Sequence, residues 1–111
     1  MASSLRFVTR EGSVQEVHMV MNEIDLDEAR NIGRQIGVDW NTVDLREFRK
    51  GLEVELEHGS RDPQTNVTND DMVLTGKIAL AHLKEVPDYY TRLEKMEAAA
   101  YAYWDAKGTK V

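Results

Sequence analysis

The chain contains no cysteine and only two prolines among its 111 residues. The absence of cysteine excludes disulfide bonds, thiolate zinc sites, iron–sulfur clusters and cysteine nucleophiles. No apolar run approaches the ~18 residues that a membrane-spanning helix needs. The amino-terminal residues also lack the apolar core of a signal peptide. We therefore expect a soluble protein that is located in the cytoplasm or in a virion and is not secreted through a signal peptide.

Positive charge is also scarce in the sequence. The chain has 20 acidic and 14 basic residues, which gives a formal net charge of −6. Where basic residues do cluster, around Arg46, Arg49 and Lys50, glutamates follow directly, and interspersed signs are typical of an ordinary charged surface. We therefore expect neither nucleic acid nor a membrane among the partners. We expect a protein partner or self-association.

Residues 1–24 form a unit that differs from the rest of the chain. The runs 5–10 and 14–21 flank a turn at Gly12, and their valines favour a β-hairpin. A helix is the alternative, because Ser13 and Glu16 match a capping box. A lone hairpin is only marginally stable, so this arm is expected to pack on the body or to pair with another chain. The candidate partner-binding residues in it are Phe7, Val8, Val17 and Met19.

From residue 25 to residue 111 the signals of helices dominate. Asp25 and Asp44 are each followed three residues later by glutamate, and Thr68 similarly by aspartate, as at helix starts. Pro87 opens a last helix at a favoured first-turn position. The sequence predicts helices over 25–36, 45–58 and 69–85, and a last helix that Pro87 opens and Gly108 ends. The expected fold is mainly α: a compact four-helix domain with an amino-terminal hairpin or extended arm.

Two features of this helical region concern packing and contacts. Gly76 lies in the middle of a predicted helix, where a close helix crossing would explain it. The last helix repeats apolar residues at spacings of three and four, which predicts an apolar seam along one face of the helix. Tyr101 and Trp104 lie beside that seam and are candidate partner-binding residues, because one narrow stripe cannot bury them all. The seam residues are Tyr89, Leu93, Met96, Ala100 and Tyr103.

Two glutamate–histidine pairs are the sharpest chemical signals. Glu55 and His58, and likewise His82 and Glu85, are three residues apart and share a helix face. Together they could bind a divalent metal ion between facing helices. If the two helices formed an antiparallel hairpin, the pairs would lie about 20 Å apart. They could meet if the intervening loop returned the chain, or if a homodimer brought two copies together. The structural interpretation of these side chains is favoured.

Several longer motifs resemble a small uncharacterised family that we associate with bacteria and tailed phages. These motifs are ELEHG at 55–59, TNVTNDD at 65–71, TGKIALAHL at 75–83 and PDYYTRLEKME at 87–97. The likeness covers roughly residues 26–97. It implies a compact helical domain and implies no activity.

The sequence shows no catalytic triad and no glycine-rich phosphate loop. We therefore expect a non-catalytic binding or assembly protein without a cofactor, whose contacts use the amino-terminal arm and the carboxy-terminal aromatic residues. The resemblance implies an association with phage as one form of this role. The alternative is a metal-binding helical domain that uses Glu55, His58, His82 and Glu85.

Overall fold

The computed structural model describes residues 23–107, which contain four α-helices. The helices are α1 (Leu26–Gln35), α2 (Leu45–Glu55), α3 (Met72–Glu85) and α4 (Tyr89–Lys107), and a short 3₁₀ helix, η1 (Leu56–His58), follows α2. The predicted four-helix, mainly α architecture is confirmed. The predicted hairpin falls on residues 1–22, so it lies outside the described residues, as do Phe7, Val8, Val17 and Met19.

The helix starts follow from carboxylates that cap backbone N–H groups. The Asp25 carboxylate accepts a hydrogen bond from the Glu28 N–H at 2.8 Å, and Asp44 caps α2 in the same way. The predicted start of α3 at Thr68 is wrong, because Asp71 caps that helix instead. Asn69 and Asp70 have φ values of 51° and 65°, in the left-handed region, which a right-handed helix cannot include.

Helices α1, α2 and α3 pack together and form the body of the molecule. The hydrophobic core lies between them. On α2, Phe48 and Leu52 are completely buried. Helix α4 contributes Tyr90 from its first turn. The buried hydrophobic residues are Ile24, Ala29, Ile32, Val43, Phe48, Leu52, Ala79, Leu83 and Tyr90.

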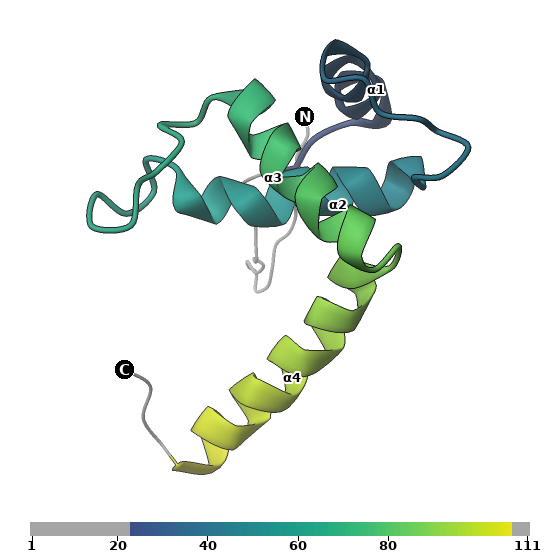
Figure 1. Ribbon diagram of the computed structural model, residues 1–111. Coiled ribbons are helices and arrows are strands. Elements are labelled where there is room, and N and C mark those ends of the chain that lie inside the picture. Colours follow the sequence, from purple (N-terminus) through teal and green to yellow (C-terminus); the bar gives the residue numbers. More distant parts are fainter. Residues whose placement is uncertain (1–22, 108–111) are drawn as a thin grey trace, which may run out of the picture.

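Helices α2 and α3 cross each other closely (Figure 1). A Cβ atom added to Gly51 would lie 2.9 Å from the Ala79 Cβ and 2.6 Å from the Tyr90 ring. A Cβ atom on Gly76 would lie 2.9 Å from Ile32. Glycine is therefore required at these helix positions by close packing, as the sequence predicts for Gly76.

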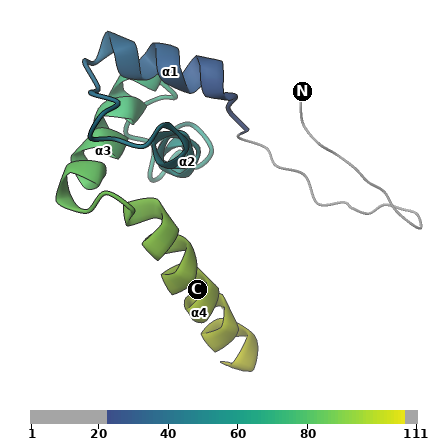
Figure 2. The same cartoon turned by 90° about the vertical axis from the view of Figure 1, so that its right-hand side faces the viewer.

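Helix α4 begins on the body and then extends away from it, as Figures 1 and 2 show. Its early seam residue Leu93 packs against the core, whereas Met96 and Tyr103 are 57% and 54% exposed. The predicted seam thus continues beyond the part of the helix that the body covers. None of the helices within residues 23–107 is both long enough and apolar enough to cross a membrane.

Candidate functional site

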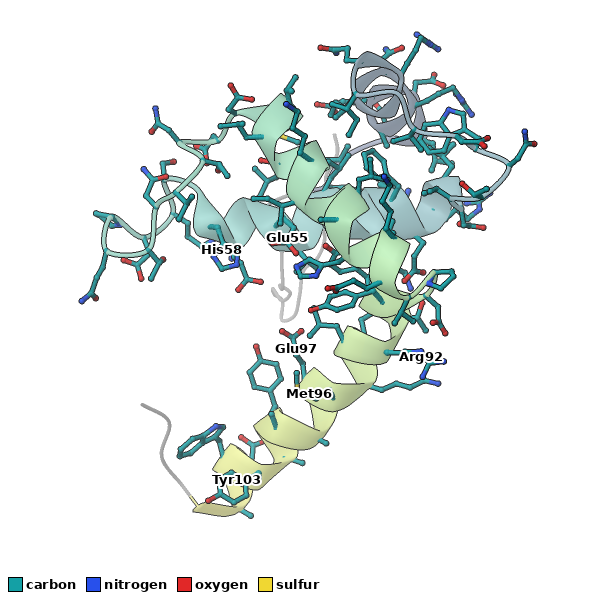
Figure 3. All side chains as sticks on the ribbon, viewed as in Figure 1. Glu55, His58, Arg92, Met96, Glu97 and Tyr103 are labelled. Carbon is teal, nitrogen blue, oxygen red and sulfur yellow. The ribbon has the colours of Figure 1, made fainter. Side chains whose placement is uncertain are left out.

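The Glu55 carboxylate is the centre of a polar cluster at the junction of α2, η1, α3 and α4. It lies at the end of α2 and is only 5% exposed. Its Oε1 atom is 3.7 Å from Nε2 of His58, and its Oε2 atom is 3.7 Å from Nε2 of His82. Figure 3 shows Glu55 and His58 close together at the end of α2. One buried carboxylate therefore faces two imidazoles from different elements.

Tyr90 of α4 completes this cluster. Its hydroxyl donates a hydrogen bond of 2.7 Å to Oε2 of Glu55. Burial and this hydrogen bond to Glu55 raise the pKa of Tyr90 above its ordinary value, so the phenol remains a protonated donor. The contact ties the base of α4 to the end of α2.

The ring of His82 is held from three sides. It stacks on Tyr89, with ring centroids 4.3 Å apart and an interplanar angle of 12°. Its edge meets the ring of Tyr90. Its Nδ1 atom is 3.4 Å from Oε1 of Glu85, while its other nitrogen faces Glu55. The imidazole is therefore oriented with one carboxylate at each nitrogen.

The structure brings together all four residues of the two predicted pairs, as a chain of contacts from His58 through Glu55 and His82 to Glu85. A separation of about 20 Å between the pairs applies only to an antiparallel hairpin. Instead α2 and α3 cross near Gly51 and bring their carboxy-terminal turns to the same place. Tyr90 was not among the predicted site residues, because no local spacing connects it to Glu55 and only the crossing places the two side by side.

A second buried carboxylate anchors α4 at its first turn. Glu47 is 8% exposed, and it accepts hydrogen bonds of 2.8 Å from both the backbone N–H and the hydroxyl of Thr91. The sequence pairs Glu47 with Asp44 as a capping box of α2. Asp44 does cap α2, but the Glu47 side chain instead satisfies a backbone donor at the start of α4.

Among the described residues, the ion-pair neighbours of Glu55 are histidines alone. They are His58 and His82, and no lysine or arginine of this part of the chain reaches the carboxylate. Within residues 23–107, no group of three or more His, Asp and Glu side chains is spaced to hold a metal ion as it stands. The predicted metal role of Glu55, His58, His82 and Glu85 stays a prediction.

The outer half of α4, residues 96–107, is the second candidate site. Met96, Tyr101 and Tyr103 are each more than half exposed, and Trp104 is partly buried. The rings of Tyr103 and Trp104 meet edge to face, with centroids 5.2 Å apart. Two of the predicted partner-binding residues, Tyr101 and Trp104, therefore lie on a helix that extends beyond the body.

These observations define a small helical domain with a polar junction at the base of its last helix. The chain belongs to the family described as "Protein of unknown function (DUF5661)", whose model matches residues 29–99. This confirms the resemblance to an uncharacterised family, while an origin in bacteria or tailed phages stays a prediction. No curated protein and no solved structure matches the chain.

Proposed function

We propose that this is a binding and assembly protein that pairs with a second copy of itself through the outer half of α4. The observation that carries the proposal is the exposure of large apolar side chains there, at 57% for Met96 and 54% for Tyr103. Covering apolar surface is favourable by about 25 cal/mol per Å². A surface of this kind on an extended helix is typical of a protein interface.

The spacing of the seam favours another helix as the occupant. Leu93, Met96, Ala100 and Tyr103 alternate at intervals of three and four, which are the a and d positions of a coiled coil. The body covers the beginning of this seam at Leu93 and leaves Met96 and Tyr103 exposed. A second α4 would continue the packing that the body begins.

The charges beside the seam favour a second copy in parallel orientation. Arg92 and Glu97 project from opposite edges of α4 (Figure 3). In the heptad they occupy g and e positions, five residues apart. In a parallel pair a g residue faces the e residue five positions later on the other helix. Arg92 would therefore meet the Glu97 of the second copy, and twofold symmetry repeats the pair.

The expected association is weak. The outer half of α4 has a length of about 18 Å, and the interface would be smaller than those of stable dimers. Arg92 already bonds Asp88, the residue before α4, at 2.7 Å, so the ion pair between copies replaces or shares an existing contact. The amino-terminal candidates Phe7, Val8, Val17 and Met19 remain a separate prediction from sequence, which deletion of residues 1–22 tests.

Light scattering on size-exclusion chromatography tests the assembly function. Over about 10 µM to about 1 mM protein, the molar mass should rise towards twice that of the monomer. Met96→Glu should abolish the rise. Ala98→Glu adds the same charge on an exposed position outside the seam and should leave it intact. A molar mass that stays monomeric throughout, or equal effects of both variants, would contradict the proposal.

A further inference from the structure

We infer that Glu47 is the positioning residue of α4: it fixes the direction in which the outer half of this helix leaves the body. This role deepens the proposed assembly function and rests on it, because that function needs α4 to present its seam to a second copy. Three side chains of α2 hold the first turns of α4 by polar contacts. They are Glu47, Lys50 and Glu55.

Helix α2 caps the start of α4 from a distance. The first N–H groups of a helix have no acceptor within the helix. Glu47 accepts hydrogen bonds from both the backbone N–H and the hydroxyl of Thr91, each at 2.8 Å. Asp88, directly before α4, instead bonds Nε of Arg92 at 2.7 Å. The buried Glu47 carboxylate thus satisfies a donor at the start of α4 that a local side chain usually satisfies, and it ties that start to α2.

The spacing of the contacts opposes movement of α4. Glu47 and Glu55 are eight residues apart, which is about 12 Å along α2. They bind consecutive residues of α4, Thr91 and Tyr90, whose side chains leave the helix about 100° apart. Between them lies Gly51, where the Tyr90 ring packs too closely to leave room for a Cβ atom. Two directional contacts so separated resist both rotation of α4 about its axis and swinging of its outer half.

Lys50 extends these contacts by one turn of α4. Its Nζ atom is 3.5 Å from Oγ1 of Thr91 and 3.1 Å from Oε1 of Glu94. The side chains of Lys50 and Glu94 are 35% and 59% exposed, and ion pairs with this exposure contribute little to stability. The buried carboxylate of Glu47 is therefore the principal contact on this side of Gly51.

A fixed direction of α4 favours association of two copies. The proposed interface is small, and ordering a mobile helix during association would cost entropy that a small interface offsets poorly. A helix that is already held in one direction presents Met96 and Tyr103 without that cost. Loss of the Glu47 carboxylate should therefore weaken association, although Glu47 lies on α2 and outside the seam.

Glu53 provides a matched control on the same helix. Its carboxylate accepts a hydrogen bond of 2.9 Å from the backbone N–H of Ile24, which is not part of α4. Glu47→Ala and Glu53→Ala each remove a carboxylate from a distant backbone donor, and both should lower Tm. Only Glu47→Ala should weaken self-association in sedimentation equilibrium, by at least about fivefold. Thr91→Val is a milder second variant, because it removes the hydroxyl and retains the backbone contact with Glu47; it should weaken association in the same direction.

Distance measurements between two spin labels test the direction of α4 in the monomer. Gln35→Cys in α1 and Ala98→Cys in α4 are exposed positions, and the chain has no natural cysteine that would take a label. Double electron–electron resonance on dilute protein, mixed with unlabelled chain, should give a narrow distance distribution. Glu53→Ala should leave its width unchanged, whereas Glu47→Ala and Thr91→Val should broaden it.

The two readouts distinguish failure of the positioning role from failure of the proposed function. Equal widths in all variants would overturn the positioning role even if copies associate. Equal weakening of association by Glu47→Ala and Glu53→Ala would also overturn it. A wild-type chain that stays monomeric would overturn the assembly function, while broadening by Glu47→Ala would still support the role of Glu47. If Glu47→Ala does not fold, the width measured for Thr91→Val decides.

Discussion

The two halves of α4 have similar apolar spacing but very different surroundings. In the first half Tyr90 is completely buried and its hydroxyl donates a hydrogen bond to Glu55. The Glu47 carboxylate accepts a hydrogen bond from the Thr91 backbone N–H. In the outer half Met96 and Tyr103 are more than half exposed. The comparison teaches that periodicity identifies which face of a helix is apolar. It does not tell whether the same chain or another molecule covers that face.

Truncation of a core residue on α2 and of a residue in the outer half of α4 should give the largest contrast. Leu52 is completely buried, so Leu52→Ala should lower the free energy of unfolding by about 2–5 kcal/mol. Met96→Ala should change it by less than about 0.5 kcal/mol when measured on dilute, monomeric protein. Urea denaturation followed by circular dichroism measures both. Similar losses at the two positions would show that the body covers the outer half of α4 in solution.

Gly51→Ala tests the close crossing of α2 with α3, where the first turn of α4 also packs. In an open helix this change is stabilising by up to about 1 kcal/mol. Here the new Cβ would meet the Tyr90 ring and Ala79, so we expect a loss of about 1–3 kcal/mol. Thermal unfolding measures the shift in Tm, which should be negative. A higher Tm would contradict the close crossing.

Tyr90→Phe should have an effect of similar size. It removes the donor to Glu55 and leaves a buried carboxylate oxygen without that hydrogen bond, at a cost of about 1–3 kcal/mol. The neighbouring Tyr89→Phe retains the ring that stacks on His82 and should cost less than about 0.5 kcal/mol. Denaturant unfolding of the two variants compares them directly. Equal stabilities would mean that the Tyr90 hydroxyl contributes nothing at the junction.

Much of the local structure could be predicted from the sequence. Asp25 and Asp44 cap their helices as the sequence indicates, and Gly76 lies at a close crossing. These features depend on residues near one another in the chain, whose physical requirements are visible in the pattern. The predicted start of α3 is wrong because a capping pattern at Thr68 was followed past Asn69 and Asp70, two residue types that adopt the left-handed conformation more readily than other non-glycine residues.

The candidate junction could be predicted only in part. The pairs Glu55–His58 and His82–Glu85 are visible as local spacings, but their meeting depends on the angle at which α2 and α3 cross. That angle is set by contacts such as Gly51 with Ala79, which join distant parts of the chain. Glu47 illustrates the same limit, because its partner Thr91 is 44 residues away.

Disulfide formation between introduced cysteines tests the central claim most directly, because the natural chain has none. In a parallel pair of α4 helices, the two copies of residue 96 lie opposite each other. Under mild oxidation Met96→Cys should therefore form a covalent dimer, while Ala98→Cys, on an exposed position outside the seam, should remain monomeric. Equal crosslinking of both variants, or none with Met96→Cys at high concentration, would contradict the account.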